Sequence, residues 1–145
     1  MNQIEKAIKI ALEAHTEQKD KAGETYILHP LRLMLQMETE EEKVVAVLHD
    51  VIEDSEYTFE DLRHEGFSAE VVDAIDCVTK REGEDYDEFI ERIVKNTLAA
   101  RVKIADLKDN SNLDRLENVT DKDRERADKY KEAIAKLESV NPYQG

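Results

Sequence analysis

The sequence contains few of the residues that interrupt helices or cross-link a chain. Its 145 residues include four glycines, two prolines and a single cysteine, and they include no tryptophan. Scarce glycine and proline favour helices, and a lone cysteine excludes an intrachain disulfide. We expect this cysteine, Cys77, to be a buried and unreactive side chain, because it lies within an apolar run.

Long apolar runs and an excess of positive charge are absent as well. No segment is long enough to cross a membrane, and the N-terminal residues lack the apolar block and cleavage site of a signal peptide. We therefore expect a cytoplasmic protein with no membrane partner. Lysine and arginine number 21 against 35 aspartates and glutamates, a net charge of −14. Because nucleic-acid binding requires a basic surface, we expect no nucleic-acid partner. A homo-oligomer is compatible with this composition.

The apolar residues recur at helical spacing along almost the whole chain. We expect the first helix to carry one apolar face that consists of Ile4, Ala7, Ile8, Ala11 and Leu12. Thr39 to Glu42 resemble a capping box that opens another helix. The predicted helices cover residues 2–17, a stretch with Pro30 in its first turn, and a stretch that begins at residues 39–42 and includes residues 44–54. Further helices are predicted over residues 59–64, 69–79, 86–95 and 98–113. Thr120 or Asp121 caps the last predicted helix. The fold class is therefore all-α. We expect a single domain over residues 1–140 and a frayed C-terminal tail over residues 141–145.

Residues 44–54, VVAVLHDVIED, place an imidazole and three carboxylates in an otherwise apolar helical segment. On a continuous helix Glu53 lies one turn beyond His49, and Asp54 lies one turn beyond Asp50. A helix that only packs has no use for such a cluster, and acids near a helix C-terminus are disfavoured by the macrodipole. A bound metal ion is the natural compensation.

Two other positions offer further metal ligands: His29 before Pro30, and Asp106 within RVKIADLKDN. Two imidazoles with carboxylates and no thiolate suit Mn²⁺, Fe²⁺, Co²⁺ or Zn²⁺. Because neighbouring side chains leave a helix about 100° apart, a shared ion would lie at a junction of several helices. Each residue alone has a plainer interpretation. His29 would be a helix-start histidine, Asp106 a solvated acid, His15 a polar-face or interface residue and His64 an exposed one.

Four segments in order carry a more specific resemblance: AHTEQKDKAGETYILHP, VLHDVIEDS, VTKR and RVKIADLKDN. Together they resemble the HD superfamily, and more narrowly the hydrolase domain of the Rel/Spo alarmone enzymes and their small single-domain relatives. The similar region spans roughly residues 4–116. The resemblance implies an HD-domain helical bundle that acts as a metal-dependent phosphohydrolase. It also implies one bound Mn²⁺, with Fe²⁺, Co²⁺ or Zn²⁺ as alternatives, held by the residues that match His29, His49, Asp50 and Asp106.

The same resemblance implies roles in catalysis and substrate binding. The residues that match Glu53 and Asp54 position and activate the attacking water. The substrate of the family is guanosine tetra- or pentaphosphate, a small phosphorylated nucleotide whose 3′-pyrophosphate is removed. The expected substrate-binding residues are Lys21, Tyr26, Lys103 and Asn110. A chain of 145 residues is too short to add the alarmone synthetase domain, so no pyrophosphokinase activity is expected.

Two departures from the family pattern bear on the substrate. Asp20 stands where the relatives carry an arginine before the lysine, and Leu107 stands where they carry an arginine after the metal aspartate. Neither change affects the metal ligands. The first removes an arginine that helps to hold the nucleotide in the relatives, and both leave the specificity for a guanine nucleotide open. Two alternatives therefore stay open: an HD phosphatase of another phosphorylated metabolite or nucleotide, and a non-catalytic metal-containing nucleotide sensor. The acidic pair Glu53 and Asp54 argues against the sensor, which has no need to activate water.

Overall fold

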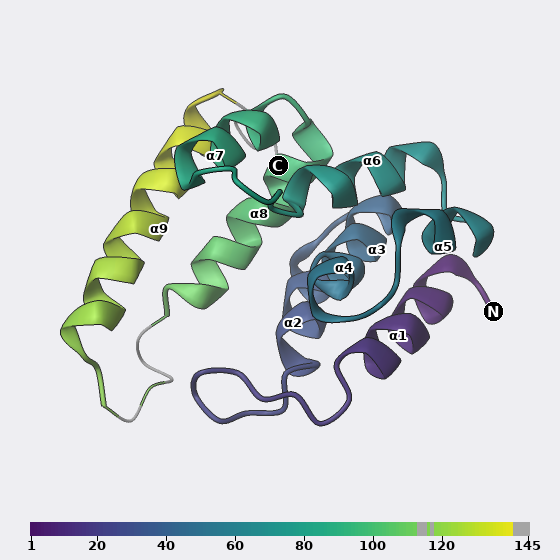
Figure 1. Cartoon of the computed structure of the whole chain (residues 1–145), viewed down its shortest axis with the longest axis horizontal. Coiled ribbons are helices and arrows are strands. Elements are labelled where there is room, and N and C mark those ends of the chain that lie inside the picture. The colour runs from purple at the N-terminus through teal and green to yellow at the C-terminus, as the bar shows by residue number, and fades with distance from the viewer. Residues whose placement is uncertain (113–115, 117, 141–145) are drawn as a thin grey trace.

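The computed structural model describes residues 1–112, 116 and 118–140, and these ranges are built from helices joined by short loops (Figure 1). The helices are α1 (Gln3–Ala14), α2 (Leu28–Gln36), α3 (Glu40–Leu48), α4 (Val51–Asp54), α5 (Phe59–His64), α6 (Ala69–Val78), α7 (Tyr86–Val94), α8 (Thr97–Asn110) and α9 (Asp121–Val140). Within these ranges the one β-type contact is an isolated antiparallel bridge between Lys19 and Thr25. The predicted all-α class is confirmed. The predicted tail over residues 141–145 lies outside the described residues.

Side chains close the N-termini of several helices, as the sequence predicted. At α3 the Thr39 hydroxyl accepts the Glu42 N–H at 3.1 Å, and the Glu42 carboxylate accepts the Thr39 N–H at 3.0 Å. Thr120 and Asp123 exchange the same pair of bonds at the start of α9. These bonds satisfy N–H groups that have no partner inside a helix, and so they fix where each helix begins.

Helix α3 forms the centre of the core. Residues 44–48 are at most 2% exposed, and a helix that is apolar on every side requires neighbours all round. Helices α1, α2, α6 and α8 supply them. Helix α8 also packs against α7 and α9, so it links the core to the C-terminal helix. In Figure 1, α9 and α1 lie at opposite ends of the molecule, with α3 and α8 between them.

Three local expectations were wrong. Segment 44–54 is not one helix: α3 ends at Leu48, and Asp50, at φ −108° and ψ 1°, precedes the separate helix α4. Leu12 is 53% exposed, whereas Ala7 and Ala11 of the same predicted face are buried. His15, expected to be a polar-face or interface residue, is buried at the end of α1, so it does not lie on a polar face. None of the helices in the described ranges combines the length and the apolar composition that a membrane span requires.

The buried carboxylate of Glu42 joins α3 to α8. Besides its role in the α3 cap, it accepts a bond from Arg101 at 2.7 Å. Burial opposes its ionisation, but Arg101 and the backbone N–H groups of Thr39 and Glu38 outweigh burial and lower the pKa of Glu42 below its ordinary value. Such a group stabilises the fold when ionised, and this contribution is lost as the pH falls through its folded-state pKa.

We expect Glu42→Gln to keep the capping bonds and to lose the ion pair, since glutamine also serves in capping boxes. Arg101 is partly exposed, so the loss in free energy of unfolding should be only about 1 kcal/mol at pH 7. The difference in free energy of unfolding between wild type and variant should narrow below about pH 4.5, the ordinary pKa of glutamate. Urea unfolding across this pH range measures it, with exposed Glu41→Gln as the control. A difference in free energy of unfolding that stays constant down to pH 3 would contradict a stabilising ion pair between Glu42 and Arg101.

Candidate metal centre and adjoining pocket

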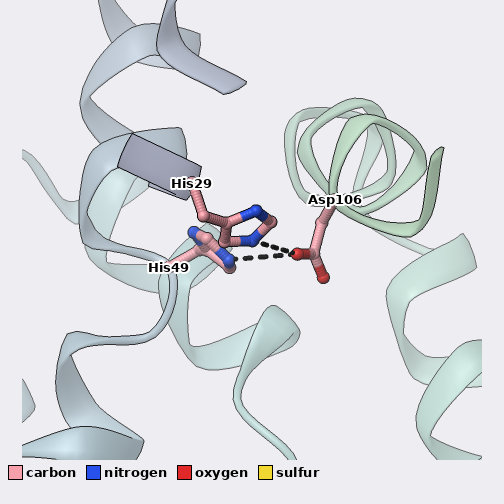
Figure 2. A group of neighbouring side chains, drawn as sticks. All are labelled: His29, His49 and Asp106. Atoms are coloured by element: carbon pink, nitrogen blue, oxygen red, sulfur yellow. Dashed lines mark hydrogen bonds and ion pairs between the residues drawn. The ribbon is translucent and has the colours of Figure 1, made fainter. Parts of the chain in front are cut away.

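Three helices bring two histidines and an aspartate to one point. His29 lies in the first turn of α2, His49 follows the last residue of α3, and Asp106 lies on α8. One potential ligand atom from each lies within 4.8 Å of the other two, and all three side chains are buried. Figure 2 shows both imidazoles pointing at the Asp106 carboxylate. This buried His–His–Asp group could hold a metal ion.

The orientation of His49 is fixed from behind by the backbone. Its Nδ1 lies 2.7 Å from the Ala46 carbonyl oxygen. A carbonyl can only accept, so Nδ1 carries the proton and the neutral ring presents a lone pair at Nε2. That Nε2 lies 3.0 Å from Asp50 Oδ2 and 3.2 Å from Asp106 Oδ1. It makes no well-formed hydrogen bond to any described residue, although it is fully buried.

His29 is oriented in the same way by a carboxylate. Its Nδ1 lies 2.6 Å from Asp109 Oδ2, and its Nε2 lies 2.8 Å from Asp106 Oδ1. Asp109 also accepts two bonds from Arg32, at 3.0 and 2.9 Å. Burial disfavours the charge on Asp109, but His29 and Arg32 outweigh burial and lower the pKa of this carboxyl. Metal-binding histidines are commonly oriented by such a carboxylate partner.

Hydrogen-bond donors surround the Asp106 carboxylate. Besides the two imidazoles, Asp106 accepts bonds from Lys103 at 3.1 Å and from Asn110 at 3.0 Å. Despite burial, Lys103 and His49 hold the pKa of Asp106 well below its usual range. Burial alone would lower the pKa of His49, but Asp50 and Asp106 raise it well above the usual histidine value. The two carboxylates thus demand positive charge at Nε2, which either a proton or a divalent ion can supply.

Asp50 lies at the edge of this group and is held by a tyrosine. The hydroxyl of Tyr26 donates to Asp50 Oδ2. Burial and the charge of Asp50 raise the pKa of Tyr26, so the phenol stays protonated and serves as a donor. The ring of Tyr26 also lies between those of His15 and His29, with centroid distances of 4.7 and 5.6 Å.

The acids Glu53 and Asp54 each accept a hydrogen bond from a different segment of the chain. Glu53 accepts the backbone N–H of Lys80 at 2.9 Å, and Asp54 accepts the side-chain amide of Gln18 at 3.1 Å. Burial, supported by Asp50, raises the pKa of Glu53 against the opposing effect of Lys80. The predicted repulsion of Glu53 and Asp54 by a helix macrodipole is absent here, because α4 has only four residues and Asp50 precedes it. The separate helix α4 has no long ladder of aligned dipoles.

A pocket of about 280 Å³ adjoins the centre. Tyr26 and Asn110 line it, and the same two residues bond to Asp50 and Asp106. The pocket is lined by Lys19, Asp20, Lys21, Ala22, Tyr26, Asn110, Asn112, Leu116, Arg126 and Tyr130. Of the four residues expected to bind substrate, Lys103 alone is missing from this lining, because its ammonium group bonds to Asp106.

The charge of the pocket is set by its loop and by α9. Burial and the nearby Arg126 lower the pKa of Lys21, against the opposing effect of Asp123. Asp20 turns one carboxylate oxygen back into its own loop, where it accepts the N–H groups of Ala22 and Glu24 at 2.9 and 3.0 Å. Lys19, Lys21 and Arg126 therefore make this pocket more basic than the net charge of the chain suggests.

Sequence reasoning missed several residues of the site. Asp109 follows Asp106 by three positions on α8, a helical spacing that places both on one side and that could have identified it. Arg32 follows His29 by three positions in the same way. Arg126 and Tyr130 of α9 carried no comparable signal, because charged and aromatic residues on a surface helix are common.

No protein-family model matches the chain. The chain is 32% identical over 120 residues to a guanosine-3′,5′-bis(diphosphate) 3′-pyrophosphohydrolase from Aquifex aeolicus, over 74% of this chain and 17% of that protein. It is 37% identical over 112 residues to a protein of the same name from Haemophilus influenzae, over 69% of this chain and 16% of that protein. The chain thus spans about a sixth of the length of these curated relatives.

The chain is also similar to a third relative and to a solved structure. A GTP pyrophosphokinase from Streptomyces coelicolor is 39% identical over 84 residues, which are 55% of this chain and 10% of that protein. The fold resembles that of a metazoan ortholog of SpoT described as hydrolysing ppGpp and acting in starvation responses, with a TM-score of 0.76. That likeness has 22% sequence identity and covers 97% of this chain and 92% of the other.

We expect Asp109→Asn to weaken metal binding about 10- to 100-fold, because it removes the charge that orients His29 while leaving every proposed ligand in place. Isothermal titration with Mn²⁺ measures the dissociation constant. Asp73→Asn, an exposed change on α6, serves as the matched control. Equal affinities for wild type and Asp109→Asn would show that Asp109 does not support the centre.

Proposed function

We propose that this chain, which is related to the Rel/Spo alarmone enzymes, is a metal-dependent phosphohydrolase. Its proposed reaction removes the 3′-pyrophosphate of guanosine tetra- or pentaphosphate or of a related alarmone nucleotide. The observation that carries the proposal is the juxtaposition of the buried His–His–Asp group with a basic pocket, joined through Tyr26 and Asn110. The names of the relatives from Aquifex aeolicus and Haemophilus influenzae support the same reaction.

The proposed metal ligands are His29, His49, Asp50 and Asp106, with Mn²⁺ as the expected ion and Fe²⁺, Co²⁺ or Zn²⁺ as alternatives. The buried Nε2 of His49 faces two carboxylates and makes no hydrogen bond to the described residues, so it fits a metal ion that supplies the positive charge required there. Asp50 lies 3.0 Å from that atom, within reach of the same site. A bound divalent ion would lower the pKa of a coordinated water and polarise a phosphoryl oxygen.

The side chains around the centre have complementary roles in this proposal. Glu53, whose pKa is raised by burial, is suited to accept a proton from the attacking water. Asp54, its neighbour on α4, orients that water. Lys103 lies 3.1 Å from Asp106 and supplies a positive charge as negative charge develops on the phosphoryl group.

The adjoining pocket is proposed to hold the rest of the nucleotide. Lys21 and Arg126 supply positive charge for phosphates, and Tyr26 and Tyr130 supply aromatic surface for a base or ribose. This local basicity removes the objection that a chain of net charge −14 would repel an anionic substrate.

One observation favours a second candidate, an HD phosphatase of another phosphorylated nucleotide or metabolite. Asp20 is folded into its own loop, and Leu107 is only 1% exposed. The arginines that the family carries at these two positions therefore have no counterpart in this chain. Metal chemistry is unaffected by this difference, whereas selection of guanine is weakened.

A hydrolysis screen with added Mn²⁺ separates the two candidates. The substrates are guanosine and adenosine 3′-pyrophosphorylated nucleotides, ordinary nucleotides and a generic phosphate ester. We expect release of pyrophosphate from the 3′-pyrophosphorylated nucleotides. Release of orthophosphate from the other esters alone would favour the second candidate, and no turnover with bound metal would favour a sensor.

Two variants test the assignment of metal and water roles. We expect Asp106→Asn to lose Mn²⁺ binding and turnover together, because it removes the charge on which both imidazoles converge. We expect Asp54→Asn to retain Mn²⁺ but to lose about 100-fold or more in kcat. Calorimetry and steady-state kinetics measure the two effects, with Asp73→Asn as control. Full turnover by either variant would overturn its assignment.

A further inference from the structure

The C-terminal end of α1 carries a buried histidine that the proposed reaction does not use. His15 is 2% exposed and follows Ala14, the last residue of α1. Its Nδ1 lies 3.0 Å from Gln18 Oε1 and 3.5 Å from Asp54 Oδ2, and its ring packs against Tyr26. A histidine that only filled the core would not need these polar neighbours.

The direction of each hydrogen bond follows from the chemistry of the groups. A carboxylate can only accept, so Gln18 must present its amide nitrogen to Asp54, at 3.1 Å. The amide oxygen of Gln18 is then the atom that faces His15, and a carbonyl oxygen requires a donor. His15 Nδ1 therefore carries a proton. A proton on Nε2 would have no acceptor among the described residues.

The chain between these residues is held in a conformation that favours this arrangement. The Gln18 N–H donates to the His15 carbonyl at 3.0 Å and closes a turn. Within that turn Glu17 has φ 64°, a left-handed conformation that side chains other than glycine seldom adopt. The Tyr26 N–H donates to the Gln18 carbonyl at 2.8 Å, which ties the turn to the tyrosine that bonds Asp50. Strained backbone of this kind gathers near functional sites.

We propose that His15 is a positioning residue for the hydrolysis, which acts through the Gln18 amide to fix the orientation of the Asp54 carboxylate. The inference rests on the proposed function, because Asp54 orients water only if the chain is a hydrolase. Without the His15 donor, the Gln18 amide is free to rotate. Asp54 then loses a fixed donor, and the orientation of its carboxylate is no longer set. The metal ligands themselves are untouched.

The test is a double-mutant cycle with His15→Phe and Gln18→Met, measured on the Mn²⁺-loaded full chain with the substrate that the screen identifies. Phenylalanine keeps the ring against Tyr26 and removes the donor. Each single variant should lower kcat about 10- to 100-fold while KM and Mn²⁺ affinity change little. Because both act along one path, the double variant should be no worse than either single variant. His15→Asn, which retains a nitrogen donor near the Nδ1 position, should restore part of kcat.

The controls separate positioning from folding. His64→Phe, the same change at an exposed position on α5, should leave kcat at the wild-type value. If His15→Phe fails to fold, Gln18→Met at its partly exposed position still decides the matter, because wild-type kcat there would overturn the proposal. Losses in kcat that multiply in the double variant, or a change in KM alone, would also overturn it. If the wild type hydrolyses nothing, the proposed function itself fails, whereas an active wild type with fully active variants refutes only the positioning role.

Discussion

Two imidazoles that turn their Nε2 atoms toward one carboxylate oxygen form the constraint on which the site depends. His29 and His49 approach Asp106 Oδ1 at 2.8 and 3.2 Å inside the core. Lone pairs facing a carboxylate in a buried setting repel unless a cation lies between them. A proton on an imidazole or a divalent metal ion relieves that repulsion. A metal ion at this point is also the proposed catalytic group.

The surrounding fold serves this convergence. The Ala46 carbonyl and the Asp109 carboxylate each fix a ring from behind, and both lie on helices buried in the core or packed against it. The break between α3 and α4 allows His49 and Asp50, which are adjacent in sequence, to approach the same centre. Glu53 and Asp54 follow on α4 and accept bonds from Lys80 and Gln18.

Much of this arrangement could be predicted from sequence, because local signals carry it. Helical spacing, the Thr39–Glu42 cap and the ordered motifs gave the all-α class, and the same motifs identified His29, His49 and Asp106, which the fold brings together. The remainder depends on tertiary contacts. Nothing in the apolar residues 44–54 marks a break, since the same spacing fits a continuous helix. The burial of His15 and the placement of Arg126 against Lys21 follow from how α1 and α9 pack, which periodicity does not encode.

The most direct test of the central claim is the ¹⁵N NMR spectrum of the histidine side chains during titration with Zn²⁺, a diamagnetic ion that suits the same donors. The account predicts that one equivalent shifts the Nε2 resonances of His29 and His49 together, with both Nδ1 atoms remaining protonated, while exposed His64 stays unchanged. A shift confined to one of the two histidines, or no shift at all, would contradict a metal ion at the point where they converge.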